Sequence, residues 1–217
     1  MPPRGLDPSG LVLVDKPAGP SSFAIVRDLR DRTGARTGHA GTLDPFATGL
    51  LLVLLGRFTK EQNRLMGLDK RYLTEVDVAR TTTTGDPEGE TVEEHEAPSR
   101  AELEGRLTRL RGEVDLRIPA ASAVKIGGER AYRRHRRGED VEMPIRRSTV
   151  RSLDLVDYAD GVATLDLLVG SGTYVRSIAA ELGGHCRSLR RTEIGPFRVE
   201  DADPTRIVPP EEALAAL

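Results

Sequence analysis

Cysteine is nearly absent from this 217-residue chain, because Cys186 is the only one. A single cysteine excludes an intramolecular disulfide and any zinc site built on cysteine ligands. The histidines also lie too far apart in the sequence to suggest a metal motif: His39, His95, His135 and His185. We therefore expect no metal site.

Long apolar runs are absent as well. The longest, Leu50–Leu55, is far shorter than the ~20 residues that a membrane span requires. Residues 1–10 contain no charged segment followed by an apolar stretch, which is the pattern of a secretory signal peptide. From these absences we expect a cytoplasmic protein that does not bind a membrane.

A charge excess of either sign is also missing, because the formal net charge is −2. The chain therefore has no overall attraction to nucleic acid, and a polyanionic partner would have to bind a local basic surface. One such segment exists at residues 125–151, with nine Lys and Arg against four Asp and Glu. Its centre, "RRHRRG", fits either the solvated end of a helix or a phosphate-binding patch, and composition leaves both open.

With 38% hydrophobic and 30% charged residues, the chain can bury one sizeable core. Hydrophobic periodicity predicts strands at 11–14, 71–79 and 162–169, and helices at about 22–32, 99–112 and 174–182. In the first helix, which Ser21 or Ser22 could cap, Phe23, Val26 and Leu29 recur at helical spacing. Neither a repeat nor a linker is visible, so we expect a single domain at 1–217 of the α/β (α+β) class with a mixed sheet.

The stretch "GHAGTLDPFATGLL" at residues 38–51 places one carboxylate, Asp44, before the apolar run. It resembles the G-H-x-G-[TA]-L-D-P-x-A-x-G-[LM]-L signature of the TruB family of tRNA pseudouridine-55 synthases. Further segments resemble family motifs in the family's order: "LVLVDKPAGPSS", "DKRY", "GSGTYVRSIAAELG" and "SLRRTEIGPF". Two positions depart from the family pattern, since Ala121 stands where an aromatic residue is usual and Thr83 where an acid is usual.

The resemblance implies a pseudouridine synthase fold: a mixed, largely antiparallel sheet flanked by helices, in one catalytic domain without a C-terminal PUA domain. It also implies the reaction. The N1–C1′ bond of uridine 55 in the tRNA T-loop breaks, the uracil turns, and its C5 joins C1′. This isomerisation requires neither a redox cofactor nor ATP, so we expect none. The expected partner is the T-arm of tRNA, and the enzyme is expected to act as a monomer.

By the resemblance, Asp44 is the catalytic nucleophile and Arg176 pairs with it. An ionised Asp44 could attack C1′ or add to C6 of the ring, and both routes stay open. A carboxylate among apolar walls tends to take up a proton unless a cation lies within ~4–6 Å, and a guanidinium keeps its charge there. The local pattern also allows simpler interpretations: an Asx-type turn or helix N-cap for Asp44, and a helix-surface charge for Arg176.

The resemblance also assigns residues that bind the substrate. The target uridine must leave its stack, at a cost on the order of a few kcal/mol, and Tyr72 is expected to stack on it or to aid proton transfer. Tyr174 and Leu189 would line the pocket, His39 would fill space or stack in the opened loop, and Lys16 would form a wall of the site or contact RNA. Without the resemblance, Tyr72 and Leu189 fit core positions and His39 fits a turn.

Other functions fit the sequence less well. A nucleotide hydrolase or kinase needs a phosphate-binding loop such as GxxxxGK[ST], and "GARTGHAGT" has no lysine in place. A non-catalytic module that binds or folds tRNA would not need Asp44 or Arg176. A pseudouridine synthase that acts on another RNA stays an alternative, which mapping pseudouridine in a treated tRNA would decide.

Overall fold

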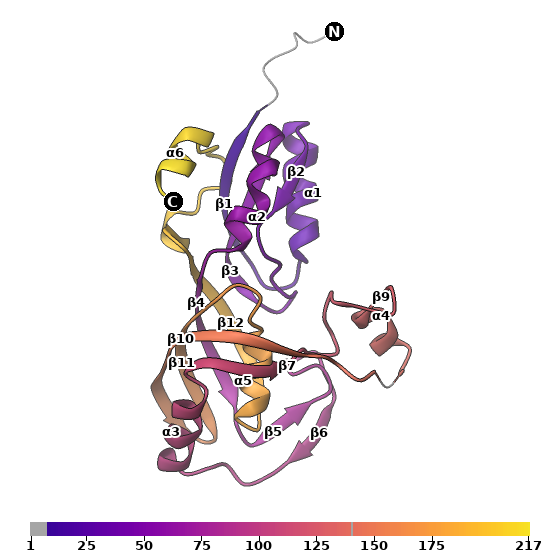
Figure 1. Ribbon diagram of the computed structural model, residues 1–217, viewed down its shortest axis with the longest axis vertical. Helices are drawn as coiled ribbons and strands as arrows, with labels where there is room; N and C mark the ends of the chain where they lie inside the picture. Colours follow the sequence, from indigo (N-terminus) through magenta and orange to yellow (C-terminus); the bar gives the residue numbers. More distant parts are fainter. Residues whose placement is uncertain (1–7, 140) are drawn as a thin grey trace. The chain divides into compact units, whose positions relative to one another are not determined.

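A computed structural model describes residues 8–139 and 141–217, which divide into two compact units (Figure 1). The described part of unit 1 is residues 8–72 and 189–217, and unit 2 is residues 73–188. Strands β4 (Lys70–Asp77) and β12 (His185–Ile194) contribute residues to both units. The expected architecture, a mixed and mostly antiparallel sheet flanked by helices, is confirmed. The expectation of one domain stays a prediction.

Unit 1 is built around β3 (Thr48–Leu55), the strand that the long apolar run forms. It pairs antiparallel with β1 (Gly10–Lys16) over seven residue pairs and antiparallel with β2 (Thr37–His39) at its end. At its start it pairs parallel with β12, where Gly49 lies opposite Arg191. This strand therefore has neighbours on both edges.

Both faces of β3 are also buried, and residues 50–55 alternate between two cores. Positions 51, 53 and 55 pack with β1 and α1 (Ser22–Thr33). Positions 50, 52 and 54 pack with residues from the remaining elements of unit 1: η1 (Gly56–Glu61), α2 (Gln62–Met66), β13 (Phe197–Arg198), η2 (Val199–Asp201) and α6 (Pro210–Ala215). Burial on both faces explains why the sequence here is continuously apolar instead of alternating.

Helix α1 begins as the sequence predicts, because the Ser21 hydroxyl accepts a hydrogen bond from the N–H of Ala24 at 3.2 Å. Val26 and Leu29 are buried, in agreement with their spacing. Phe23 is not part of that face, since it is 63% exposed. The buried position in the first turn is taken by Ser22, so the apolar face expected from Phe23, Val26 and Leu29 was wrong at its first member.

The sheet of unit 2 has the order β12, β4, β11 (Val162–Val169), β10 (Ile145–Ala159) and β7 (Gly112–Arg117). The predicted strand at 162–169 coincides with β11, and β4 shows the predicted alternation of buried and exposed residues. Strands β10 and β11 form a hairpin around Asp160 and Gly161, which both have positive φ (50° and 74°). Two such residues give a turn whose twist matches that of the strands.

Unit 2 also contains β5 (Arg80–Thr82), β6 (Thr91–Glu94), α3 (Arg100–Arg109), β8 (Lys125–Ile126), β9 (Glu129–Arg130), α4 (Ala131–Arg136) and α5 (Val175–Glu181). The predicted helix with its Ser99 cap is confirmed as α3, where Ser99 and Glu102 form a capping box. Across the part of the chain that the structure describes, none of the helices is both long and apolar enough to cross a membrane.

Gly49 allows β3 and β12 to approach each other closely. A Cβ built at Gly49 would overlap the carbonyl oxygen of Arg191 and lie 2.7 Å from its backbone nitrogen. Gly49 also has φ of 102°, a conformation that side chains of L-residues rarely adopt. Both the backbone angle and the space therefore require glycine here.

We predict that Gly49→Ala lowers the free energy of unfolding by at least about 2 kcal/mol more than Gly19→Ala does, because only the first adds a backbone clash. Gly19 is a matched control, since its φ is 101° and a Cβ there would meet nothing within 4 Å. Urea unfolding of both variants measures the difference. Equal losses in the free energy of unfolding for the two variants would show that β3 and β12 can move apart at no cost.

Candidate functional site

Asp44 lies in the loop between β2 and β3 and is half-buried. The N–H of Ala47 donates to the carbonyl oxygen of Asp44 at 3.2 Å, so residues 44–47 form a tight turn. Strand β3 begins directly afterwards at Thr48. The backbone therefore forms a turn at Asp44, and the interpretation of Asp44 as a helix N-cap is wrong. The Asx-type turn, in which the Asp44 side chain would take part, stays a prediction.

Two side chains from the N-terminal motif hold this loop. The Ser22 hydroxyl donates to the carbonyl oxygen of Leu43 (2.9 Å) and accepts from its N–H (2.8 Å). The Lys16 ammonium donates to the carbonyl oxygen of Pro45 at 3.2 Å and, more closely, to those of Pro17 and Pro20. Lys16 is completely buried, and its expected role as a wall of the site or an RNA contact stays a prediction. The residues on both sides of Asp44 are thus fixed.

A third side chain, that of Arg191, holds both ends of the loop. Its Nε donates to the carbonyl oxygen of Leu50 at 2.7 Å, and one terminal nitrogen donates to that of Gly41 at 3.0 Å. The side chain is only 1% exposed. From the sequence, no role was predicted for Arg191. The feature that could have indicated one is its place in the segment "SLRRTEIGPF", which resembles a family motif. Its geometry joins residues 41 and 50, which bracket Asp44.

Burial and the Arg191 charge together lower the pKa of two side chains near the loop. Burial and the nearby Arg191 charge lower the pKa of Lys70 to about 8, and the same two causes lower the pKa of His39. Lys70 donates to the carbonyl oxygens of Met66 and Leu68. His39 is therefore a neutral imidazole at neutral pH, which suits packing against an uncharged base better than binding a phosphate.

Unit 2 contains a second group of candidate residues around Arg176, in the first turn of α5. Its guanidinium donates to the carbonyl oxygens of Thr84 (2.7 Å) and Ala121 (2.9 Å) and lies 3.5 Å from the Asp86 carboxylate. Arg176 is 3% exposed, which excludes its interpretation as a helix-surface charge. Asp86 is buried too, and its carboxylate accepts from the Thr84 hydroxyl and from the N–H of Glu88.

From the sequence, Asp86 was not predicted as a site residue. Asp86 belongs to the loop "TTTGDPEG", in which the first of the two acids of the family pattern is absent. Thr83 stands in place of that acid. Its N–H donates to the carbonyl oxygen of Glu90 and its hydroxyl accepts from the N–H of Glu90, across the β5–β6 hairpin. The other departure, Ala121, contributes a carbonyl oxygen to Arg176, and every residue type has that group. The departures at Thr83 and Ala121 therefore leave the contacts of Arg176 with Thr84, Ala121 and Asp86 in place.

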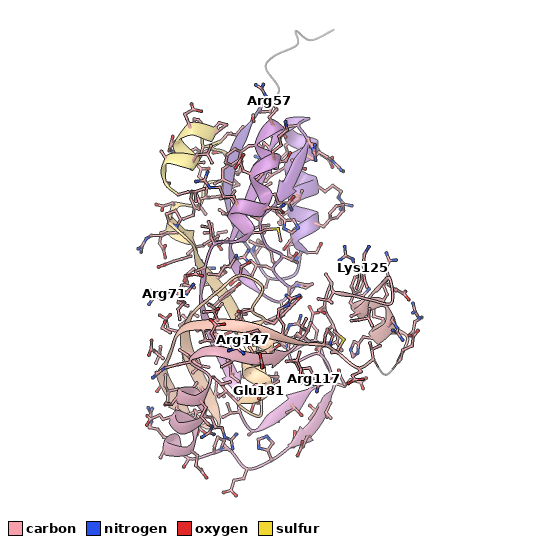
Figure 2. All side chains as sticks on the ribbon, viewed as in Figure 1. Arg57, Arg71, Arg117, Lys125, Arg147 and Glu181 are labelled. Carbon is pink, nitrogen blue, oxygen red and sulfur yellow. The ribbon has the colours of Figure 1, made fainter. Side chains whose placement is uncertain are left out.

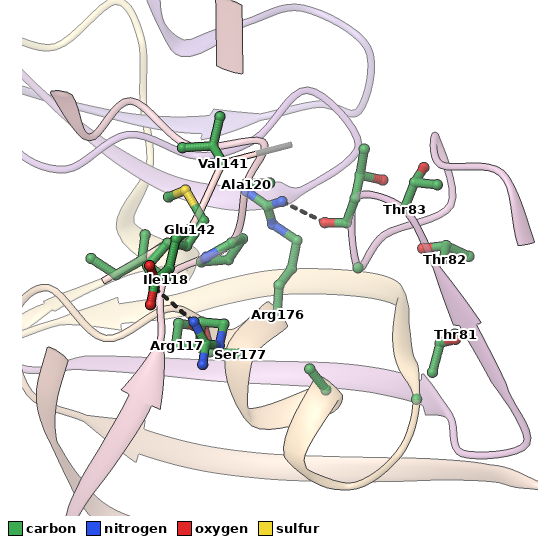
Figure 3. Close-up of a pocket in the computed structure, with 16 residues that line it drawn as sticks. Thr81, Thr82, Thr83, Arg117, Ile118, Ala120, Val141, Glu142, Arg176 and Ser177 are labelled. Atoms are coloured by element: carbon green, nitrogen blue, oxygen red, sulfur yellow. Dashed lines mark hydrogen bonds between the residues drawn. The ribbon is translucent and has the colours of Figure 1, made fainter. Parts of the chain in front are cut away.

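Arg176 lies in the wall of a cavity of about 740 Å³ within unit 2 (Figure 3). The cavity is lined by the β5 end and following loop (Thr81–Gly85), by Arg117–Ala120, by Val141–Met143 and by Ser177, Ala180 and Gly184. Its volume is in the range of small-ligand sites. Tyr174 precedes α5, packs on the cluster of Ile118, Ala131 and Met143, and has the Arg146 guanidinium 5.9 Å from its ring centre.

The basic segment, in which Figure 2 labels Lys125, is partly neutralised by its own acids. Arg137 forms two 2.8 Å bonds with Glu129, and both Arg134 and Arg137 bond Glu139 at 2.7 Å. The same bonds lower the pKa of both glutamates. Two other arginines instead lie about 6 Å from the ring of Tyr132: Arg133 and Arg136.

The predicted site residues thus divide between the units. Asp44, Lys16, His39, Tyr72 and Leu189 belong to unit 1, whereas Tyr174 and Arg176 belong to unit 2. Tyr72 and Leu189 are both buried, in β4 and β12. Within unit 1, Lys16 contacts the turn that carries Asp44. The pairing of Asp44 with Arg176 stays a prediction.

Residues 30–175 match the family described as TruB family pseudouridylate synthase (N terminal domain). A tRNA pseudouridine synthase B of Corynebacterium efficiens is 43% identical over 209 residues, covering 90% of this chain and 70% of that protein. Another, of Streptomyces avermitilis, is 39% identical over 236 residues, covering 96% and 78%. The relatives therefore share nearly the whole of this chain.

Solved structures show the same fold. A crystal structure of a Cbf5-Nop10-Gar1 complex matches with a TM-score of 0.67 and 25% identity, over 87% of this chain and 50% of that one. An H/ACA RNP bound to a substrate RNA matches with a TM-score of 0.64 and 22% identity. The chain spans about half the length of these solved chains. Fold and sequence together define a pseudouridine synthase, an isomerase. The chain belongs to the TruB family.

We predict that Arg191→Lys lowers kcat for pseudouridine formation by about tenfold or more while the Kd for RNA changes less than about threefold. A lysine keeps the charge but cannot hold Gly41 and Leu50 together. The matched control is Arg190→Lys, at a less buried neighbour that pairs with Asp15. Single-turnover kinetics and filter binding separate the two effects, and an unchanged kcat would show that the loop keeps its shape without this contact.

Proposed function

We propose that this chain converts uridine 55 in the T-loop of tRNA to pseudouridine and acts as a monomer on the T-arm. The observation that carries the proposal is the loop of Asp44, in which neighbouring backbone groups at residues 41, 43, 45 and 50 are bound by buried side chains. A carboxylate so placed has the rigid support that a nucleophile needs. The relatives named tRNA pseudouridine synthase B favour tRNA as the substrate.

In this proposal Asp44 begins the reaction as an ionised carboxylate. It attacks either C1′ of the ribose or C6 of the uracil, and the N1–C1′ bond breaks. The uracil then turns within the site, its C5 bonds to C1′, and the bond between Asp44 and the substrate breaks, which regenerates the Asp44 carboxylate. Loss of the proton from C5 and addition of a proton at N1 complete the isomerisation, with no change in the number of atoms or electrons.

Arg176 is proposed to keep Asp44 ionised by lying beside it when the substrate is bound. The Asp86 carboxylate and two carbonyl oxygens already hold the guanidinium in one orientation. An arginine retains its proton in such a buried place, because the delocalised guanidinium is a much weaker acid than an ammonium, whereas a lysine could lose its proton. Asp86 is then a positioning residue that acts through Arg176.

Tyr72 is proposed to stack on the uracil after it leaves the T-loop, with Leu189 and Tyr174 as further walls. Stacking on an aromatic ring contributes ~1–3 kcal/mol per base, which offsets the cost of extruding the uridine. His39, neutral in its buried place, is proposed to fill space in the opened loop. Arg133 and Arg136 are proposed as phosphate contacts, because neither takes part in the ion pairs that engage Arg134 and Arg137.

Two alternatives make different predictions. A module that only binds or folds tRNA would leave uridine unchanged, and a synthase for another RNA would leave tRNA unmodified. Incubating the chain with an unmodified tRNA transcript and mapping pseudouridine at single-nucleotide resolution distinguishes all three. Pseudouridine at position 55 alone is the expected result.

We predict that Asp44→Asn lowers the rate of pseudouridine formation by more than about 100-fold, since the amide is not a nucleophile. The Kd for tRNA should change by less than about threefold, because phosphate and stacking contacts dominate affinity. Tritium release from [5-³H]uridine tRNA and filter binding provide the two measurements. A rate within tenfold of the wild type would remove Asp44 from the nucleophile role.

We predict that Arg176→Lys lowers kcat by about tenfold or more although the charge is kept, because an ammonium cannot reproduce the geometry of a guanidinium. Arg187→Lys, an exposed change in β12, is the control and should keep wild-type turnover. Asp86→Asn should move kcat in the same direction as Arg176→Lys. Wild-type turnover in Arg176→Lys would mean that this arginine only supports the fold of unit 2.

A further inference from the structure

Aromatic side chains are scarce in this protein, and one of them is left in solvent. The chain has four Phe, four Tyr and no Trp. All eight lie in the part of the chain that the structure describes, and only Phe23 among them is exposed, at 63%. A single exposed apolar residue is ordinary by itself. The position of Phe23 in the fold, however, indicates a function for its exposed ring.

Phe23 lies directly beside the residue that holds the loop of Asp44. Ser22 is bonded in both directions to the backbone of Leu43, which precedes Asp44 in the sequence. The first turn of α1 is therefore attached to the loop by two short hydrogen bonds. A group that contacts Phe23 lies close to the segment that presents the proposed nucleophile.

Two arginines continue the same side of α1. At 100° per residue, positions 23, 27 and 30 lie within about 60° of one another around the helix. Arg27 and Arg30 are both exposed. Among the described residues, Arg27 forms no ion pair, and Arg30 forms one solvent-exposed pair with Asp31 at 3.6 Å. The stripe thus combines an exposed ring with positive charge.

This combination fits unpaired nucleic acid. Bases released from a duplex stack on aromatic rings, and arginines neutralise the phosphates that follow them in the strand. An apolar protein partner would not use the arginines, and an acidic one would not require the ring. Both features together favour RNA.

We propose that the side of α1 formed by Phe23, Arg27 and Arg30 is a contact surface for the substrate RNA, in which Phe23 stacks on an unpaired T-loop base other than the target uridine. The proposal rests on the proposed function, because the RNA is its substrate. It adds a stacking position apart from Tyr72 and a phosphate contact outside the basic segment at residues 125–151.

The test is the binding of an unmodified T-arm stem-loop by the full chain. Phe23→Ala should raise Kd by about 5- to 150-fold without changing the slope of log K against log salt, whereas Phe23→Trp should keep wild-type affinity. Arg27→Ala should reduce that slope by about 0.7–0.9, the value for one phosphate. The matched control is Arg32→Ala, about 180° from Phe23 on the same helix and paired with Asp28.

Several results would overturn the proposal. A Kd for Phe23→Ala within twofold of the wild type would remove the stacking contact, and an equal loss in Arg32→Ala would show a general charge effect. Self-association of the RNA-free chain that Phe23→Ala abolishes would assign this face to a second copy. If the variants bind RNA with wild-type affinity while the wild type modifies uridine 55, the proposed contact surface on α1 is wrong and the proposed function stands. If the wild type binds through Phe23 but forms no pseudouridine, only the proposed function fails.

Discussion

The approach of β3 to β12 at Gly49 and Arg191 is the contact on which the proposed site depends. The absent side chain of Gly49 lets the two backbones meet, and the side chain of Arg191 then reaches Leu50 and Gly41. The loop that carries Asp44 is consequently tied to a strand buried on both faces, and its geometry follows from core packing. A loop held in this way has little freedom to lose when a substrate binds.

Buried positive charge is used here to fix backbone. Lys16, Lys70 and Arg191 are all buried, and each donates to at least two carbonyl oxygens. Taking a charge out of water costs several kcal/mol unless hydrogen bonds replace its hydration. The carbonyls gain as well, because loop oxygens in a dry place would otherwise lack donors. The lowered pKa of Lys70 is the visible trace of that cost.

Local regularities of the sequence predicted local structure well. The two-residue period of β4 and the cap of α3 each depend on neighbours in the chain, and the motifs identified the family. Strand β10 was missed because its 15 residues alternate irregularly. Phe23 was misplaced because spacing alone does not say which residue of a first turn faces the core. Asp86 and Arg191 were missed because the partner that gives each its role is distant in sequence: Asp86 pairs with Arg176, and Arg191 bonds a carbonyl 141 residues away.

The glutamates within the basic segment limit how tightly the chain can hold any polyanion. Each arginine that bonds Glu129 or Glu139 is one fewer to displace counterions from a phosphate, and such displacement is the source of affinity that ignores sequence. The modified RNA keeps the phosphates of the unmodified RNA. Strong ion pairs between the arginines and these phosphates would therefore hold product and substrate equally. Internal neutralisation therefore favours release after the reaction and reduces trapping by RNAs that carry no target.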